Sequence, residues 1–550
     1  METDRRIEKK VNAKNIRFNI MAILLIAIFC FAISPVTLQN DTFYTIKIGE
    51  HIIENGIDMH DPFSFHDLEY TYPHWLYDVG IYLIYNVGGQ VGIYISTIVL
   101  CMTLGILLYA TNVKLTKNRV TSFIITIGAM YLLRDFIAAR AQLVTFILFV
   151  LTIYFIERFL ETKKKRYAIG LVIIPIIIAN VHVAVFPFYF ILYLPYIGEY
   201  MIYILSNSSI IINTSKIKSL HKKLKKTDDI KEIEKIKDEI NKIEDRINVL
   251  TTRKERINNN PYKIKILGND NVKLLIIIMI ICLFAGLLTP LGSTPYTYLV
   301  KTMQGNTTHN INEHLPLTLV NNINFMVVLV LFIAILMFTD TKIRLSDLFM
   351  LGGLTLLTFY SRRQESMFVL MCAFILNRLI CSMFNKYDPE ACTKIQNWMT
   401  KIIGMITTIC LVLIISINQY KPKIGNAFVD EKSYPVMASD YILNHLDINN
   451  IKLYNEYNYG SYLLFRGIPV FIDSRADLYS PEFNEGVNIF TDFLNLNGVN
   501  NDKVEETLDK YGITHLILYK DNKLRTFIKQ DEEKYEQLYE DDYFCIYERK

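Results

Sequence analysis

The chain has 550 residues, of which 51% are hydrophobic and 20% are charged, and its mean hydropathy is +0.24. This composition excludes an ordinary soluble enzyme and predicts a protein embedded in a bilayer. The net charge is only +4 and acidic residues interleave with the lysines, so we expect no nucleic-acid partner.

Apolar runs recur along the chain at lengths close to that of a membrane-spanning helix. Because a span needs roughly 20 apolar residues, the pattern predicts about 11 transmembrane helices. The expected spans are 18–38, 91–111, 120–133, 141–160, 167–181, 184–205, 272–290, 322–339, 345–360, 365–384 and 400–418. The first run is too long for a cleaved signal peptide and lacks a small-residue cleavage site, so we expect a retained helix.

Basic loops indicate which side of the membrane each segment faces. Residues 1–17 are strongly basic, and basic residues near span ends mark the cytoplasmic side. Alternating the spans from a cytoplasmic N-terminus also places the basic loops 113–119 and 161–167 inside. The first loop, 39–76, and the region 419–550 then lie outside. The sequence therefore predicts a multi-pass protein of the cell membrane with an extracytoplasmic C-terminal domain.

A charged insertion at 214–262 interrupts the expected transmembrane domain, 18–418. Isoleucine and leucine recur there at alternating steps of three and four, which is the spacing of a coiled-coil seam. The seam residues are Ile233, Ile236, Ile240, Ile243, Ile247 and Leu250. Thr227, Asp228 and Asp229 form a helix-start signal, so we expect a cytoplasmic helical hairpin. A solvated hairpin and a docking or dimerising element are both open as its role.

The C-terminal region, 419–550, alternates helical and strand-like patterns. Short buried strands are expected at 451–455, 469–474 and 514–520, with a last edge strand at 541–550. Strands separated by helices predict a small α/β domain with a largely parallel sheet.

The first loop carries an unusual concentration of ionisable groups. Between Asn40 and Trp75 it has seven acidic residues against one basic residue, Lys47, together with four of the ten histidines. Asp41 directly follows the first span. A carboxylate at that depth can ligate a divalent cation or accept a proton from an acceptor nucleophile. An interfacial Asp held by a neighbouring base is the structural alternative.

These positions resemble the first external loop of bacterial GT-C-type glycosyltransferases, which use polyprenyl-phosphate sugars. The resemblance rests on Asp41, Gly49-Glu50, the run 61–64 (DPFS) and Trp75. Further similar stretches are TPLGSTPYTY (289–298), INEHLPL (311–317), SRRQESMF (361–368) and the run 455–479. The similarity covers most of the chain except the hairpin.

The resemblance implies a catalytic acid just after the first span, with a second acid and a metal nearby. Asp41 matches by position, and Asp61 is the candidate second acid. The two carboxylates are the candidate ligands of a divalent cation, Mg or Mn. The chain departs from the commonest pattern because Thr42, rather than a second acid, follows Asp41.

Four arginines occur at short turns that should lie outside, against the usual bias of basic residues toward the cytoplasm. A guanidinium suits a phosphate group, which a lipid-phosphate donor would present at this depth. Pairing with nearby acids, such as Asp135 and Glu365, is the alternative. The four are Arg134, Arg140, Arg362 and Arg363.

Other polar residues on the same side could complete a metal site or supply a base. These accessory candidates are Glu50, His60, His74, His182, His309, Glu313 and His314. In the tail, Asp473, Arg475 and Asp477 follow an expected strand end, where α/β sheets place binding groups. The alternation of Asp and Arg equally suits an internal ion-pair network, which we favour.

The sequence therefore favours a polytopic, GT-C-like membrane enzyme. It would move a sugar from a polyprenyl-phosphate donor to an envelope glycan, lipid or protein acceptor on the extracytoplasmic face. A lipid or polysaccharide transporter is one alternative, although it should carry charges in the middle of its spans. A non-catalytic assembly protein that recruits partners through its hairpin and tail is the other.

Overall fold

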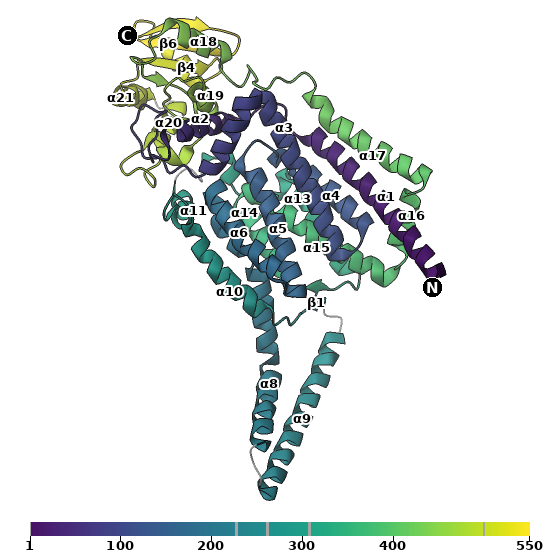
Figure 1. The fold of residues 1–550 in the computed structure, drawn as a ribbon. Helices are drawn as coiled ribbons and strands as arrows, with labels where there is room; N and C mark the ends of the chain where they lie inside the picture. The colour runs from purple at the N-terminus through teal and green to yellow at the C-terminus, as the bar shows by residue number, and fades with distance from the viewer. Residues whose placement is uncertain (1, 226–228, 260–262, 306–309, 499–500) are drawn as a thin grey trace.

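The computed structural model describes residues 2–225, 229–259, 263–305, 310–498 and 501–550. A bundle of apolar helices forms its centre, a two-helix hairpin extends from one end, and a mixed helix-and-strand region covers the other (Figure 1). The N-terminus and the hairpin lie toward the same end of the bundle, whereas the C-terminus lies at the opposite end (Figure 1). The predicted sidedness requires this arrangement, but the orientation in a membrane stays a prediction.

Long apolar helices build the bundle. Among the described residues, six helical stretches are long and apolar enough to cross a membrane: Asn12–Ile33, Trp75–Thr116, Ala141–Thr162, Val183–Ile210, Arg362–Tyr387 and Ile402–Lys423. Three shorter apolar stretches accompany them: Val272–Leu287, Ile323–Phe338 and Leu345–Tyr360. The chain is therefore a polytopic helical membrane protein, and the figure of about 11 spans stays a prediction.

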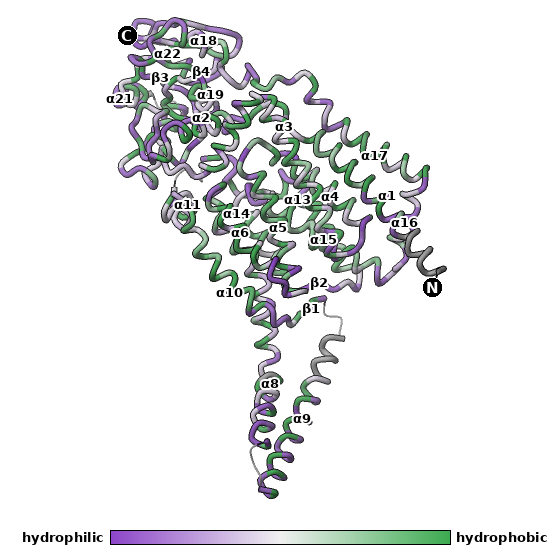
Figure 2. Tube along the Cα trace, viewed as in Figure 1, coloured by the Kyte–Doolittle hydropathy of each residue, from purple (hydrophilic) through white to green (hydrophobic). Residues whose placement is uncertain are grey.

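The bundle helices are mostly apolar along their length (Figure 2). Their bounds are α1 Glu2–Ile33, α3 Trp75–Thr116, α4 Arg119–Leu133, α5 Ala141–Thr162, α6 Lys165–Val181, α7 Phe186–Ile191, α8 Leu194–Leu224, α10 Val272–Leu283, α11 Thr294–Gln304, α13 Ile323–Phe338, α14 Leu345–Tyr360, α15 Glu365–Tyr387, α16 Ala391–Met399 and α17 Ile402–Tyr420. Short 3-10 turns connect several of them: η1 Arg134–Phe136, η2 Val183–Val185, η3 Phe284–Leu287, η4 Asn312–His314, η5 Leu319–Asn321, η6 Arg362–Gln364 and η7 Lys421–Lys423.

The expected first loop, 39–76, is largely ordered structure. Helix α2, Asn40–Asn55, occupies its first half, and α3 already begins at Trp75. Gly89 interrupts the helical geometry of α3 with a φ of 56°, so that the part of α3 before it forms a separate arm beside α2. An acidic segment of this composition need not be a loop, because α2 buries one face built on Phe43, Ile46 and Ile52.

The hairpin has the seam that the isoleucine spacing predicts. Helix α9, Ile230–Asn259, packs against the end of α8, and Ile236, Ile240 and Ile243 are buried there with Leu220 of α8. Helix α8 runs without a break across position 214, so the hairpin continues a bundle helix rather than starting a new one. The expected start signal lies partly outside the described residues, but Asp229 accepts a hydrogen bond from the Lys231 amide at 3.0 Å.

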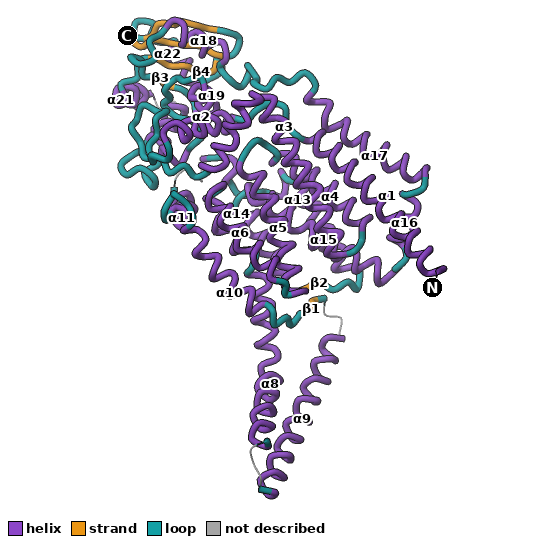
Figure 3. The backbone as a smooth tube through the Cα atoms, in the orientation of Figure 1, coloured by secondary structure: helices purple, strands orange, loops and turns teal. Residues whose placement is uncertain are grey.

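The C-terminal region contains most of the strands (Figure 3). Its elements are α18 Val436–His445, β3 Leu453–Tyr454, α19 Tyr457–Phe465, η8 Ala476–Tyr479, α20 Ile489–Asn497, α21 Asn501–Tyr511, β4 His515–Tyr519, α22 Lys523–Ile528, β5 Tyr535–Glu540 and β6 Phe544–Arg549. A separate parallel pair, β1 Ile264–Lys265 and β2 Ile343–Arg344, lies near the base of the hairpin.

Three features of the predicted C-terminal sheet are wrong. The strand at 541–550 was expected at an edge, but β6 lies between β4 and β5. The strand order is β3-β4-β6-β5, and only β3 and β4 pair in parallel, because β6 runs antiparallel to both of its neighbours. The expected strand at 469–474 is absent from the sheet. Val470 instead makes an isolated parallel bridge with Ser64 of the first loop, and its amide donates to the Phe63 carbonyl at 3.1 Å.

That bridge belongs to a larger contact between the first loop and the C-terminal region. One hydrophobic core contains Phe43 and Ile46 of α2, Tyr72 of the loop, and Leu463 and Ile472 of the C-terminal region, all buried. Helix α2 packs directly on α19. Segments some 400 positions apart therefore share one interior, because each would otherwise expose an apolar face.

Candidate functional site

Asp41 and Arg140 form an ion pair at the end of the bundle nearest the C-terminal region. Arg140 Nη2 lies 2.7 Å from Asp41 Oδ2, and Arg140 Nη1 lies 3.2 Å from Glu313 Oε1. Asp41 stands in the first turn of α2, where the helix dipole favours a negative charge. Arg140 is the residue that precedes α5, and Glu313 belongs to η4. One guanidinium thus joins three segments that are distant in sequence.

The environment of this ion pair is intermediate between surface and interior. The side chains of Asp41 and Arg140 are 23% and 28% exposed, and Arg140 Nε is buried with no hydrogen-bond partner among the described residues. Glu313 is more exposed, at 52%. Partial burial raises the pKa of Glu313, but the nearby charges of Arg140 and Arg363 outweigh it and leave that pKa below its usual value.

Two histidine rings contact each other near this ion pair, tilted by 58°. His74 precedes α3 and His182 follows α6, and their ring centroids are 4.9 Å apart. His182 Nδ1 is 3.0 Å from Thr145 Oγ1. Burial, and then the charges of Arg363 and Arg140, lower the pKa of His74 to about 3. Burial, then the charges of His74 and of both arginines, hold the pKa of His182 well below its usual value. Both imidazoles are therefore neutral at pH 7.

Of the two adjacent arginines at η6, Arg363 is the one that faces these groups. Its charge acts on His74, His182, Glu313 and His314. The guanidinium has no hydrogen bond or ion pair with any residue in the described ranges. Arg363 therefore keeps its full hydrogen-bonding capacity for another anion.

Arg362 and His314 flank the same turn in different ways. Arg362 donates from Nε to the Pro316 carbonyl at 3.3 Å, and its amide donates to the Leu315 carbonyl at 3.0 Å. Burial and the charge of Arg363 lower the pKa of His314 to about 4, although Glu313 opposes this shift.

We call the converging set the Arg140 cluster; its members are Asp41, His74, Arg140, His182, Glu313, His314 and Arg363.

Asp61 belongs to a different set of contacts. Arg475 Nη1 lies 2.6 Å from Asp61 Oδ1, and the Ser64 amide donates to Asp61 Oδ2 at 3.0 Å. Arg475 also binds Asp473, with Nη2 to Oδ2 at 2.6 Å, and Tyr479 donates its hydroxyl to the same oxygen at 2.6 Å. The side chains of Asp61 and Asp473 are 0% exposed. No contact among the described residues joins Asp61 to Asp41.

The tail residues Asp473, Arg475 and Asp477 take part in internal contacts, the role that we favoured for their alternating charges. Asp473 and Arg475 are buried against each other, whereas Asp477 binds elsewhere. Asp477 Oδ2 accepts hydrogen bonds from the hydroxyls of Tyr298 and Thr302 in α11, each at 3.0 Å. The motif therefore fastens the C-terminal region to both the first loop and the bundle.

Three other candidates lie apart from the Arg140 cluster. Arg134 stacks on Tyr131, with 4.3 Å from guanidinium to ring centroid, and its Nη2 lies 3.4 Å from Asp135. Pairing with Asp135 was the structural alternative for this residue. Glu50 pairs with Lys47 on α2. His60 is 47% exposed and lies 3.6 Å from Asp67. His309 lies outside the described residues.

The candidate metal ligands do not come together. Asp41 faces Arg140 and Asp61 faces Arg475, so each carboxylate already has a cationic partner. Within the described ranges, no three His, Cys, Asp or Glu side chains are grouped so that they could hold a metal ion. A divalent cation shared by Asp41 and Asp61 would have to compete with both arginines, and its binding stays a prediction.

Two buried charged sites lie outside the candidates that the sequence suggested. Asp78 of α3 is 0% exposed, and neither carboxylate oxygen has a hydrogen-bond partner among the described residues. Asp78 lies at the contact between α2 and α3. The helices are so close there that a Cβ on Gly49 of α2 would come within 2.1 Å of the Asp78 carbonyl oxygen. Only the pairing of the two helices buries this carboxyl, so sequence spacing does not reveal it.

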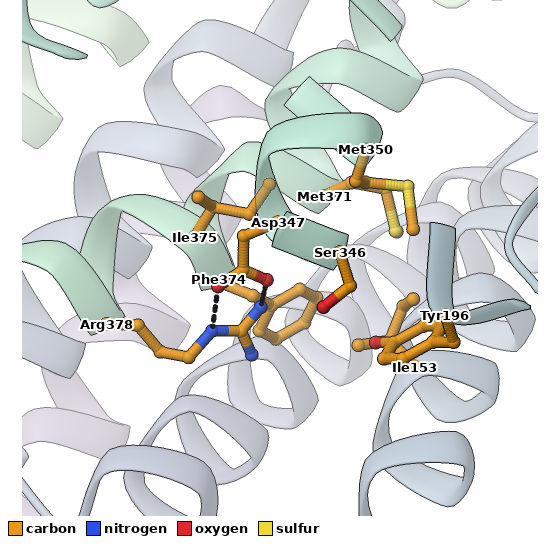
Figure 4. Close-up of a pocket in the computed structure, with 9 residues that line it drawn as sticks. All are labelled: Ile153, Tyr196, Ser346, Asp347, Met350, Met371, Phe374, Ile375 and Arg378. Carbon is orange, nitrogen blue, oxygen red and sulfur yellow. Dashed lines mark hydrogen bonds and ion pairs between the residues drawn. The ribbon is translucent and has the colours of Figure 1, made fainter. Parts of the chain in front are cut away.

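The second missed site is a four-residue ionic network at the hairpin end of the bundle. Arg344 Nη2 lies 2.7 Å from Glu157 Oε1, and Arg378 Nη1 lies 3.3 Å from the same oxygen. Arg378 also binds Asp347, beside a cavity of about 10 Å³ lined by Ser346 and Tyr196 (Figure 4). The cavity has room for about one water molecule. These charges compensate one another near helix ends rather than in the middle of a span.

Comparison with known proteins adds no family to this description. A scan against protein-family models matched none, and a search of curated proteins found no matching relative.

Proposed function

We propose that the protein is a membrane glycosyltransferase that moves a sugar from a polyprenyl-phosphate donor to an acceptor on the extracytoplasmic face. The observation that carries the proposal is the Arg140 cluster, in which a carboxylate, a guanidinium without a partner among the described residues, and neutral imidazoles converge from separate segments. The resemblance to GT-C enzymes and the membrane bundle support the same reading.

Asp41 is the proposed general base. The acceptor hydroxyl gives its proton to the Asp41 carboxylate while its oxygen forms the new bond to the anomeric carbon. The bond from that carbon to the phosphate oxygen breaks, and the lipid phosphate leaves with inversion of configuration. Arg140 holds the carboxylate in place through the 2.7 Å contact.

Arg363 is the proposed phosphate ligand. A phosphate anion would supply the partner that its guanidinium lacks among the described residues, and negative charge developing on the leaving group would strengthen this contact. His74 is neutral, so it can donate one hydrogen bond to a phosphate oxygen without adding charge. His182 is buried and its Nδ1 contacts Thr145 Oγ1, so it is proposed to support the His74 ring. Arg362 and Arg134 are proposed to act structurally, because their own neighbours already engage them.

Asp61 is proposed to position the C-terminal region rather than to assist Asp41. Its carboxylate is enclosed and bound to Arg475, so it cannot reach an acceptor without breaking that contact. The mechanism includes no metal step, because Asp41 and Asp61 form no shared donor set. The C-terminal region would cover the site from the extracytoplasmic side.

The deciding experiment compares Asp41→Asn with Asp67→Asn in membranes that contain a labelled polyprenyl-phosphate sugar. Asp67 is an exposed acid of the same loop, so its removal controls for charge. Loss of a general base should lower transfer by about 10²–10⁴-fold, whereas Asp67→Asn should retain full activity. Thermal stability should match in both variants.

Two results would remove the assignment. Full transfer by Asp41→Asn would exclude the base, and failure of the unaltered protein to consume any polyprenyl-phosphate donor would exclude the reaction. Loss of cellular function on deletion of the hairpin, with Asp41→Asn tolerated, would favour the assembly protein instead.

A further inference from the structure

The end of α8 carries a one-sided row of lysines that no acidic residue in the described part of the chain pairs with. Lys218, Lys222 and Lys225 follow one another at steps of four and three, so they lie on one stripe of the helix. All three are exposed, and none has an acidic partner among the described residues. After Glu199, α8 contains no Asp or Glu.

The remaining lysines of this segment behave differently. Lys216 Nζ lies 2.9 Å from Glu239 of α9, so it pairs across the hairpin. The apolar side of α8 uses Leu220 to pack on the α9 seam. With 3.6 residues per turn, the stripe from Lys218 to Lys225 points away from that seam. The stripe is therefore a surface that α9 does not cover.

Helix α9 provides a natural comparison within the same hairpin. Its exposed lysines Lys231, Lys235 and Lys242 also fall on one stripe, but acids alternate with them along the helix. Lys242 Nζ, for example, lies 2.8 Å from Asp238. The positive charge of α9 is thus compensated locally, whereas that of the α8 stripe is not.

We propose that Lys218, Lys222 and Lys225 form a docking surface for an acidic helical segment of a partner protein. A partner helix with acidic residues at steps of four and three matches the spacing of the stripe, which spans about 10 Å along α8. The hairpin extends away from the bundle, so the surface is open to a protein on that side (Figure 1). A long nucleic acid fits less well, because the acids of α9 flank the stripe.

The test measures binding of a labelled helical peptide to the purified full chain in detergent. The probe is an alanine-rich peptide with glutamates at the matching steps, and its control has glutamine at those positions. We expect the acidic peptide alone to bind, with affinity falling as salt rises. The triple variant K218Q/K222Q/K225Q should weaken binding at least tenfold, whereas K231Q/K235Q/K242Q, with the same charge change, should stay within twofold.

Several outcomes would overturn the proposal. They are equal losses in the two triple variants, no binding by the unaltered chain, and tighter binding of a single-stranded oligonucleotide to the same lysines. A lysine-dependent dimer detected by light scattering would assign the surface to a second copy of this chain instead. Because the charge changes are on exposed helix faces, both variants should fold with unaltered thermal midpoints.

Discussion

The guanidinium of Arg475 lies 2.6 Å from the carboxylate of Asp61, 414 positions earlier in the chain. Both side chains are almost completely buried, and Arg475 also holds Asp473. The first loop and the C-terminal region are thereby fastened to each other by charge as well as by their shared apolar core. A separate hydrogen bond, from the Asn40 side-chain amide to the Tyr457 carbonyl at 3.0 Å, ties the start of α2 to the C-terminal region.

Removing the shared cation should loosen the C-terminal region. Arg475→Met would leave two buried carboxylates without their cationic partner, which should cost about 3–5 kcal/mol. We expect a lower thermal midpoint in detergent and faster proteolysis of residues 419–550. Lys510→Met, which breaks the more exposed pair with Asp492, is the control and should cost at most about 1 kcal/mol. Equal effects would show that the buried network does not hold the region in place.

Arg140 should tolerate lysine poorly even though the charge is kept. Its two terminal nitrogens contact Asp41 and Glu313 separately, and a lysine ammonium cannot reproduce this fork. Given the proposed reaction, Arg140→Lys should lower sugar transfer by about 10–100-fold. Arg134→Lys is the matched control, because the hydrogen-bond and ion-pair contacts of Arg134 among the described residues are with its chain neighbours Asp135 and Tyr131. The same membrane assay measures both, and similar activities would count against the cluster.

Acidification should weaken the docking of the first loop through His66. Its Nε2 lies 2.9 Å from the Phe471 carbonyl, and burial lowers its pKa from 6.5 to about 4. Below pH 6.5 His66 is protonated in the unfolded chain but stays neutral in the folded chain. The free energy of unfolding therefore falls as the pH drops from about 6.5 to about 4. The loss is at most about 3 kcal/mol.

The dependence of stability on pH can be measured as thermal midpoints of unfolding in detergent, at pH values from roughly 7.5 to 5. His66→Gln should flatten the curve in part, since His74 and His314 titrate with the same sign. His445→Gln, at an exposed position, should leave the slope as it is. An unchanged slope in His66→Gln would assign the pH dependence to other groups.

Replacing Gly49 by alanine should destabilise the protein, whereas replacing Gly128 by alanine should stabilise it. A Cβ on Gly49 would lie 2.1 Å from the Asp78 backbone oxygen, so α2 and α3 must separate, at a cost of about 1–3 kcal/mol. Gly128 in α4 has nothing within 4 Å of the added carbon, and alanine favours the helix by about 0.5–1 kcal/mol. Thermal midpoints of the two variants test both signs, and a stable Gly49→Ala protein would contradict the close helix contact.

Most of the Arg140 cluster could be named from the sequence, but its grouping could not. Asp41, Arg140, Glu313 and Arg363 each stood out as a polar residue beside an apolar run. Their mutual distances depend on how α2, α5, η4 and η6 pack. Asp78, in contrast, could not be named from the sequence at all. Nothing in its local sequence marks it, and only the contact between α2 and α3 removes it from water.

The sequence by itself determined features that repeat at short range. The apolar runs specified the helices of a membrane bundle, and steps of three and four specified the buried seam of α9, because a helix places such residues on one face. Only the tertiary structure decided that Asp61 pairs with Arg475, and that residues 469–474 meet the first loop instead of the sheet. Burial selects such long-range partners, since an enclosed charge or backbone group must find a complement wherever the chain can supply one.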